Sequence, residues 1–388
     1  MQVYADNAAT TRLCSSAWDA MAPYWREAYG NPSSLHRAGQ KAKEALENAR
    51  VSLAQHLGAK ARELVFTSGG SESDTQAILS MAAAGEKAGK RHIVSTAFEH
   101  HAVLRTLEQL QKNGFDVTLV SPGKDGIVSP ETIEQALRPD TCLVSVMYAN
   151  NEIGTLQPIS EIAGICHQRK IFLHTDAVQA AGHVPIDLHR HGIDLLSVSA
   201  HKFHGPKGIG ILYAREGLVL EKIINGGEQE RNRRAGTENV PAIVGMAAAL
   251  EEACRTMEET NRKLVDFQNR LIDGLLAIPR SFLNGDRNNR LPGNVNFTFE
   301  GVEGEALLLY LDNQGICVSS GSACASGSRE PSHVLKAIGR TQEEARNSLR
   351  ITLSRYNTLE EIEYLIAKIT EGVARLRSIS PLWKGRNL

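Results

Sequence analysis

The chain lacks a strong charge of either sign, a cysteine framework and any long apolar run. Its formal net charge of -1 argues against a broad basic field that would recruit nucleic acid or anionic lipid. None of the six cysteines forms a C-x-x-C pair, which speaks against a disulfide framework or a zinc site and indicates a reducing compartment. The N-terminus has no basic region followed by an apolar one, and no apolar run approaches the roughly 18 residues of a membrane span. We therefore expect a soluble cytoplasmic protein that holds no metal and acts on small molecules and specific proteins.

One cysteine, Cys324, lies within residues 319–328, a stretch made only of serine, glycine, alanine and this thiol. Such a stretch has few side chains to pack and much backbone freedom, which predicts a mobile loop. A thiolate on a mobile loop is suited to carry a reactive group between two places. The alternative at this stage is a flexible linker that contains a cysteine by chance.

Short apolar runs rich in β-branched residues alternate with helical patterns between about residues 64 and 213. This alternation, with runs that are apolar on both faces, predicts an α/β fold with a mainly parallel sheet covered by helices. Ligands of such sheets bind at the carboxyl ends of the strands. The runs cover residues 64–66, 92–94, 117–120, 143–146, 171–173 and 195–198.

The last third of the chain predicts a smaller α+β unit. Val295, Phe297 and Phe299 alternate with polar residues, as do Ile351 and Leu353, which is typical of half-buried strands. A final helix is indicated by an apolar stripe over residues 362–376 and by a capping-box spacing from Thr358 to Glu361. We expect a large domain over residues 13–254 and a small domain built from residues 1–12 and 255–388, with the boundary inside a long helical stretch.

Three segments together match the parts of a pyridoxal phosphate site. Residues 66–74 form a turn of small residues between a strand and a helix, where backbone N–H groups can bind a phosphate. Asp176 ends one apolar run and Lys202 follows the next, so a strand-helix-strand unit would bring both to one crevice. These residues supply an acid for a pyridinium nitrogen and an amine for a Schiff base. Taken singly, each has an ordinary alternative: a capped turn, a helix N-cap and a solvated lysine.

The chain resembles the cysteine desulfurases of the NifS/IscS type, which are class V, fold-type I pyridoxal phosphate enzymes. The similarity runs in family order over nearly the whole chain. It implies a large domain with a mainly parallel seven-stranded sheet and a smaller α+β domain that carries the Cys324 loop. The matching segments are residues 4–11, 30–34, 67–74, 99–103, 150–154, 176–179, 199–208, 234–237 and 319–335.

The resemblance implies a role for each matching residue. Lys202 forms the Schiff base, Asp176 pairs with the ring nitrogen, Gln179 bonds the ring hydroxyl and His100 stacks on the ring. The phosphate is held by Ser71, Ser199 and His201, with Gly70 and Glu72 in the same turn and Thr237 supplied by the partner subunit of a homodimer. The substrate L-cysteine is bound by Asn151, Arg350 and Asn31.

The implied reaction is the removal of sulfur from L-cysteine to give L-alanine and a persulfide on Cys324. Lys202 takes the Cα proton, the protonated ring delocalises the negative charge, and the Cys324 thiolate then attacks the substrate sulfur. His100 is the expected acceptor of the thiol proton. The persulfide then passes to an acceptor protein, such as an iron–sulfur scaffold or a tRNA-thiolation enzyme.

Some residues depart from the family pattern. Arg329 stands where these loops usually carry leucine, which could alter loop docking, and Ser71 replaces the usual threonine but keeps its hydroxyl. The chain stops at Leu388, whereas IscS-like relatives continue into a tail that docks the scaffold, so docking of that kind is not expected. The alternatives are a selenocysteine lyase, another class V aminotransferase, or a non-enzymatic scaffold. Cys324 argues against the aminotransferase, and intact Lys202, Asp176 and His100 argue against the scaffold.

Overall fold

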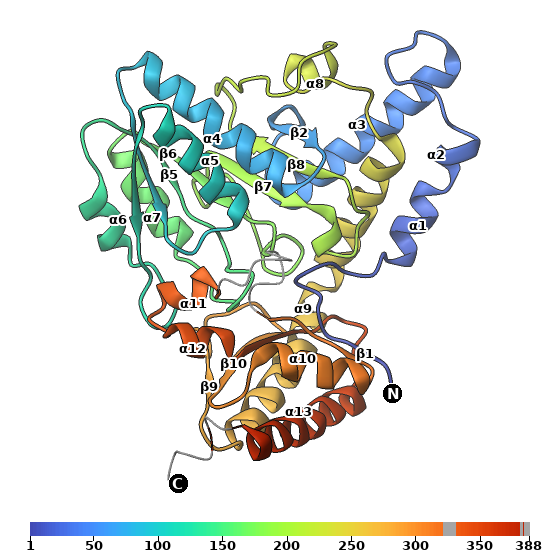
Figure 1. The fold of residues 1–388 in the computed structure, drawn as a ribbon. Coiled ribbons are helices and arrows are strands. Elements are labelled where there is room, and N and C mark those ends of the chain that lie inside the picture. Colours follow the sequence, from blue (N-terminus) through green and yellow to red (C-terminus); the bar gives the residue numbers. More distant parts are fainter. Residues whose placement is uncertain (321–330, 381–382, 384–388) are drawn as a thin grey trace.

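A seven-stranded sheet forms the centre of the larger part of the molecule, which lies above a smaller unit in Figure 1. The computed structural model describes residues 1–320, 331–380 and 383. The strand order is β2-β8-β7-β6-β5-β3-β4, and all pairs are parallel except those that β8 makes with β2 and β7. The strands are β2 (Leu64–Thr67), β3 (His92–Thr96), β4 (Asp116–Val120), β5 (Thr141–Ser145), β6 (Phe172–Asp176), β7 (Leu195–Ser199) and β8 (Gly210–Ala214).

The predicted α/β sheet is confirmed, and each of the six apolar runs lies in or overlaps a strand. The seventh strand, β8, was not among those runs, and it is the one that runs antiparallel. The prediction of a helix between β6 and β7 is wrong, because residues 177–194 form a series of turns instead. Gly182 has a φ of +78° in this connection, and its position leaves no room for a Cβ against Phe203. A left-handed glycine of this kind interrupts helical geometry.

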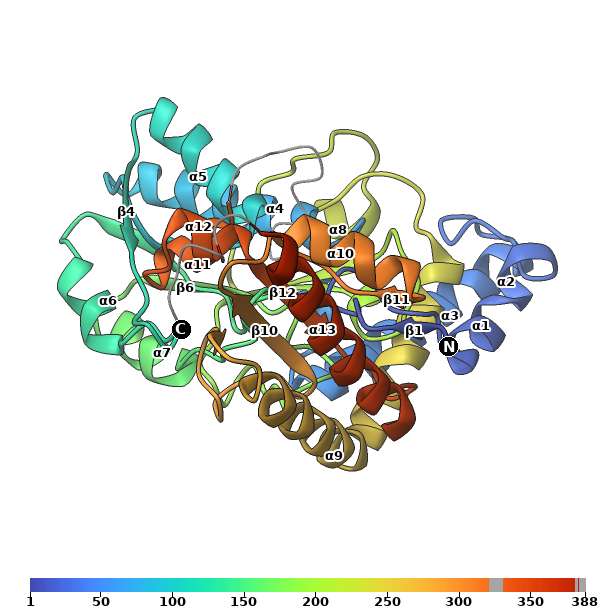
Figure 2. The same ribbon diagram turned by 60° about the horizontal axis from the view of Figure 1, so that its bottom comes forward.

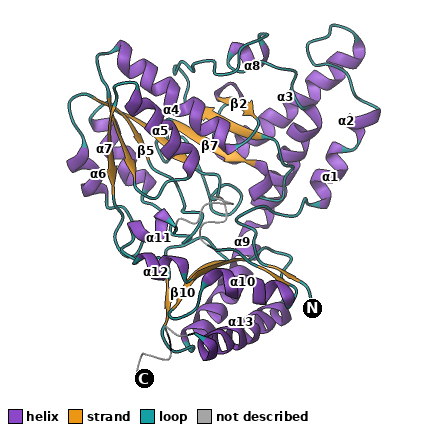
Figure 3. Cartoon of the chain, in the orientation of Figure 1, coloured by secondary structure: helices purple, strands orange, loops and turns teal. Residues whose placement is uncertain are grey.

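Helices cover both faces of the sheet, as the purple and orange elements of Figure 3 show. The long helix α9 packs against α1 and α3 in the larger part and against α13 in the smaller part, so it links the two. The helices of the larger part are α1 (Ser15–Met21), α2 (Pro23–Arg26), α3 (Arg37–Leu57), α4 (Gly70–Lys87), α5 (His101–Lys112), α6 (Pro130–Ala136), α7 (Ile159–Gln168), α8 (Gln229–Asn232) and α9 (Val240–Leu276), with short 3-10 turns at Ala61–Glu63 and Ala200–Lys202.

The smaller unit contains a three-stranded antiparallel sheet of order β12-β10-β9 and a two-stranded parallel pair of β1 with β11. Helix α13 lies beside α10 and α9 in Figure 2, in agreement with the packing between these helices. Its N-cap Thr358 forms the predicted capping box with Glu361. The elements are β1 (Val3–Tyr4), β9 (Ser281–Leu283), β10 (Asn294–Phe299), α10 (Gly304–Asn313), β11 (Ile316–Cys317), α11 (His333–Ala337), α12 (Gln342–Arg346), β12 (Ser348–Thr352) and α13 (Leu359–Ile379).

The prediction that the strands near residues 295 and 351 are half buried is wrong, because β10 and β12 are buried on both faces. Their apolar face joins the core of the smaller unit. Their polar face contacts the larger part instead of water: Asn296 Nδ2 donates to Glu152 O at 3.1 Å, and Arg350 Nη1 donates to Asn151 O at 3.1 Å. Alternation in a sequence reports polarity, and here a second protein surface takes the place that solvent would occupy.

The apolar core clusters indicate two units, but the residues of these clusters do not follow the predicted domain boundaries throughout. Val3, Ala5 and Leu264 belong to the core cluster of the smaller unit, whereas Val334 and Leu335 belong to that of the larger part. The division into a large domain of residues 13–254 and a small domain of residues 1–12 and 255–388 therefore remains a proposal. Helix α11 lies in the second of these ranges, but its buried apolar residues pack in the core of the larger part. No helix of the described residues is both long and apolar enough to cross a membrane.

A buried ion pair ties α3 to the segment that contains α8. Arg50 donates to both oxygens of Glu230, at 2.8 and 2.6 Å, and the side chains are only 4% and 3% exposed. Glu230 also accepts from Phe66 N–H at 2.9 Å, and Arg50 donates to Leu64 O at 3.1 Å. Both members of the pair thus bind the backbone of β2, the strand that leads into the site, through charge-assisted hydrogen bonds that hold the strand in place.

Replacing one member of this pair is expected to destabilise the fold. Glu230→Gln removes the buried counter-ion of the Arg50 guanidinium and leaves it only the half-exposed Glu47, whose Oε1 lies 3.3 Å from Arg50 Nε, which should lower the free energy of unfolding by about 3 kcal/mol. Urea denaturation at neutral pH measures the change. Glu216→Gln is the matched control, because Glu216 pairs with Lys60 and Arg62 on the exposed surface, and it should change stability little. Equal effects of the two variants would contradict the assignment.

Candidate active site

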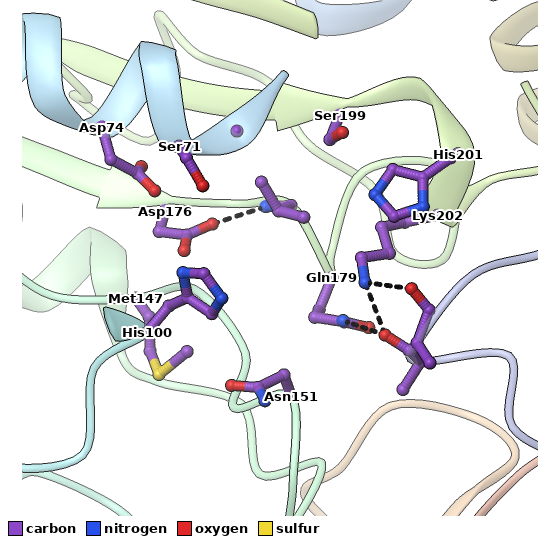
Figure 4. Close-up of a pocket in the computed structure, with 14 residues that line it drawn as sticks. Ser71, Asp74, His100, Met147, Asn151, Asp176, Gln179, Ser199, His201 and Lys202 are labelled. Atoms are coloured by element: carbon purple, nitrogen blue, oxygen red, sulfur yellow. Dashed lines mark hydrogen bonds between the residues drawn. The ribbon is translucent and has the colours of Figure 1, made fainter. Parts of the chain in front are cut away.

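A cavity of about 260 Å³ lies at the carboxyl edge of the central sheet (Figure 4). Residues that end or follow β2, β3, β5, β6 and β7 line it, because β2 points in the same direction as the parallel strands after the reversal at β8. The predicted crevice at this edge is thus present. Most of the residues expected in the site line this cavity.

One end of the cavity presents hydrogen-bond donors that suit an anion. Gly70 and Ser71 begin α4 directly after β2, and the first N–H groups of a helix have no carbonyl partner within it. Ser199, the last residue of β7, and His201, in the turn that follows, also line the cavity (Figure 4). Burial, and to a lesser extent the positive charge of Lys202, lowers the pKa of His201 to about 4, so its ring is neutral and acts through hydrogen bonds.

Glycine is required where this anion end is formed. Gly69 is the N-cap of α4 with a φ of +154°, a conformation that side chains disfavour. A Cβ on Gly70 would lie 2.6 Å from Val178 Cγ2. The backbone N–H groups of this turn can therefore approach a ligand more closely than residues with side chains would allow.

Two buried acids also line the cavity. Asp176 ends β6, and Val178 N–H donates to its Oδ1 at 2.9 Å. Asp74 of α4 lies beside it, and ligand atoms of Asp74, Asp176 and His100 fall within 4.8 Å of one another. Burial raises the pKa of Asp74 to about 6, and burial together with Asp74 raises the pKa of Asp176 to about 7. Asp74 Oδ1 lies 3.5 Å from His174 Nε2, whose ring burial keeps neutral by lowering its pKa to about 4, and no lysine or arginine of the described residues pairs with either carboxylate.

His100 lies beside these two acids and is the N-cap of α5. Ala102 N–H donates to its Nδ1 at 3.2 Å. Because Nδ1 accepts this bond, the neutral ring carries its proton on Nε2.

Lys202 lies in the turn after β7, across the cavity from the acids (Figure 4). Its Nζ donates to Ala8 O at 2.6 Å and to Ala9 O at 2.8 Å. Gln179 Nε2 also donates to Ala8 O, at 3.0 Å. Asn151, which follows β5, completes the set of predicted residues that line the cavity. The N-terminal segment therefore holds the amine at the cavity through backbone carbonyls.

The remaining predicted residues lie elsewhere. Glu72 does not line the cavity but pairs with Arg234, whose Nε lies 3.0 Å from Glu72 Oε1. Burial alone would raise the pKa of Glu72, but the hydrogen bonds from Arg234 and Ser68 outweigh burial and lower it. Thr237 and Asn31 are exposed. Arg350 is buried in β12 and paired with Asp6. Cys324 and Arg329 lie outside the described residues.

The sequence interpretation missed Asp74, Met147 and the carbonyls of Ala8 and Ala9, which also line the cavity. Asp74 follows Ser71 by three residues on α4, so helical spacing places both on one face. That spacing was a usable signal. A backbone carbonyl leaves no signal in the side-chain pattern, so Ala8 and Ala9 could not be found in this way.

Comparisons with known proteins agree over the full length of the chain. The family model described as Aminotransferase class-V matches residues 3–365. A protein of Methanosarcina thermophila named cysteine desulfurase IscS is 51% identical over 98% of this chain and 94% of its own length. The protein of Azotobacter vinelandii named cysteine desulfurase NifS is 46% identical over 99% of this chain and 95% of its own length.

A solved structure leads to the same group. The structure titled NIFS-LIKE PROTEIN has a TM-score of 0.91 and 38% identity, and the match covers 97% of this chain and 100% of that one. The match includes the seven-stranded sheet on whose edge the cavity lies. The chain belongs to the class-V aminotransferase family and, within it, to the cysteine desulfurases of the NifS/IscS type.

Proposed function

We propose that the protein uses pyridoxal phosphate to remove sulfur from L-cysteine, giving L-alanine and a persulfide on Cys324. The observation that carries this proposal is the single cavity lined by Lys202, Asp176 and the glycine-rich start of α4. Anion-binding donors, buried acids and an amine in one cavity match the phosphate, the ring nitrogen and the aldehyde of this cofactor.

The buried acids supply the test of fit. Asp74 Oδ1 is buried and has no hydrogen-bond partner among the described residues, and Asp176 is close to it. Two buried carboxylates at this spacing disfavour each other's charge, and a cationic group beside them removes that penalty. A protonated ring nitrogen is such a group. Asp176 would pair with it, Gln179 would bond the ring hydroxyl, and His100 would stack on the ring.

The phosphate would be bound by Ser71, Ser199, His201 and the backbone of Gly70. Glu72 would act indirectly, since its pair with Arg234 fixes the segment that precedes Thr237. Thr237 is exposed, which is compatible with a contact to the phosphate in the partner subunit of a homodimer. Asn31 and Asn151 would contact the substrate, and Arg350 would bind its carboxylate.

The bound cofactor supplies an electron sink for negative charge at the substrate Cα. Lys202 acts as the base, because its Nζ is held at the cavity by Ala8 and Ala9 and can take the Cα proton once it leaves them. His100 would take the thiol proton of Cys324.

The sulfur transfer forms one bond and breaks one. The Cys324 thiolate attacks the substrate sulfur, an S–S bond forms, and the Cβ–S bond breaks. The electron pair of the broken bond stays with the substrate carbon, which is protonated and becomes the methyl group of L-alanine. The persulfide sulfur would then pass to a second protein, and we propose that this occurs in the cytoplasm.

The proposed roles of Cys324 and Lys202 can be distinguished by the products that variants of each residue form. Cys324→Ala should lower sulfide release from L-cysteine in the presence of a reductant by at least about a hundredfold, because the attacking thiolate is gone. Lys202→Ala should abolish alanine formation and the visible absorbance of the Lys202-bound cofactor. Alanine and sulfide are measured side by side. Sulfide release by Cys324→Ala at the parent rate would show that this thiol is not the acceptor.

Cofactor-free protein is expected to lose stability as the pH rises. Burial raises the pKa of Asp176 to about 7 from its usual 3.8, so between these values the folded state holds a proton that the unfolded state releases. Stability therefore falls with rising pH across this window. The melting temperature should drop by roughly 3 °C or more between about pH 5 and pH 8, and Asp176→Asn should reduce the drop. The exposed substitution Asp19→Asn is the control, and an unchanged drop in Asp176→Asn would refute the assignment.

A further inference from the structure

Arg350 has a carboxylate partner inside the protein before any substrate arrives. Its side chain is 0% exposed, and its Nη2 lies 3.0 Å from Asp6 Oδ1. Its Nη1 donates to Asn151 O at 3.1 Å, while its Nε is buried without a hydrogen-bond partner among the described residues. The guanidinium thus has one anionic partner in the described structure and hydrogen-bonding capacity to spare.

Asp6 is held opposite Arg350 by the residues on either side of it. Thr352 N–H donates to Ala5 O at 2.7 Å, and Asn7 donates to Thr352 O from both its backbone and its side chain. Thr352 lies two residues after Arg350 on β12, so the backbone of Asp6 is fixed beside this strand. The carboxylate is nevertheless 20% exposed, unlike the guanidinium that it contacts.

The ion pair also adjoins the cavity. Asn151, whose carbonyl accepts from Arg350, lines the cavity, and so does Ala8, two residues after Asp6. The segment that bears Asp6 therefore contacts both cationic side chains of the site, since Ala8 and Ala9 bind Lys202. A ligand carboxylate that reaches Arg350 would lie near the Asp6 carboxylate.

We propose that Asp6 is a specificity-determining residue: it is the resting counter-ion of Arg350, and a substrate or product carboxylate competes with it for the guanidinium. This inference rests on the proposed role of Arg350 in carboxylate binding. Like charges at such spacing repel, so Asp6 weakens the binding of every carboxylate at this position. Its consequence for turnover is that L-alanine is held less tightly and leaves sooner.

The test uses Asp6→Asn in the full-length holoenzyme. The KM for L-cysteine and the inhibition constant of L-alanine should both fall by about tenfold, because the competing charge is removed while the side-chain shape is kept. Asp6→Glu keeps the charge and should stay closer to the parent in both values. Asp19→Asn changes the net charge equally on the exposed surface of α1 and should change neither value.

A binding measurement separates this proposal from the proposed function. Without L-alanine, Asp6→Asn should melt at a lower temperature than the parent, because Arg350 loses its counter-ion. Added L-alanine should raise the melting temperature more in the variant, whereas L-alaninamide, which lacks the carboxylate, should act equally on both. This arm needs no turnover, so it stands even if the parent failed to release sulfur from L-cysteine.

Unchanged or raised constants in Asp6→Asn, or an equal response of variant and parent to L-alanine, would overturn the proposal and leave Asp6 as a residue that only orients Arg350. Asp6→Ser serves as a second neutral variant if Asp6→Asn does not fold. The same direction of change is expected from it, and the opposite direction overturns the proposal in the same way.

Discussion

The site depends on the burial of the Asp176 carboxylate next to a second acid, Asp74. Burying one carboxylate without a cation is costly, and ligand atoms of these two acids and His100 lie within 4.8 Å of one another. Burial raises the pKa of both acids, and Asp74 adds to the rise at Asp176. A fold keeps such an arrangement when a ligand supplies the missing positive charge. The start of α4 lies in the same cavity, so a ligand that carries both a negative and a positive group would suit this lining. Pyridoxal phosphate with a protonated ring has that distribution.

The N-terminal segment connects this site to the smaller unit. Residues 5–9 reach Thr352 and Arg350 of β12 on one side and Lys202 and Gln179 on the other. Lys202 and Arg350, for which we propose roles at different parts of the substrate, are thereby held by one stretch of chain. This explains why the polar face of β10 and β12 is buried: it packs against the residues that line the cavity. If Arg350 binds the substrate carboxylate as proposed, the position of that carboxylate relative to Lys202 depends on how the two units meet.

The sequence predicted those parts of the site that local rules determine. Asp176 and Lys202 were found because parallel strands bring their carboxyl ends to one edge, and the turn at Gly69 was found because small residues there precede a helix. The exposure of β12 was misjudged, since polarity in an alternating strand does not reveal whether water or another surface faces it. Asp74 had a usable helical spacing, whereas the carbonyls of Ala8 and Ala9 meet Lys202 only through tertiary structure. The roles of Asn31 and Thr237 rest on the family alone, because both are exposed on this chain.

The central claim is that the cavity at the sheet edge holds pyridoxal phosphate through Lys202. Borohydride reduction of the holoenzyme fixes the cofactor to the amine that carries it, and tandem mass spectrometry of the digested protein then identifies that lysine. The account predicts the pyridoxyl group on Lys202 in the parent and its absence from Lys202→Ala. Attachment to a different lysine in the parent, or equal labelling of the variant, would contradict it.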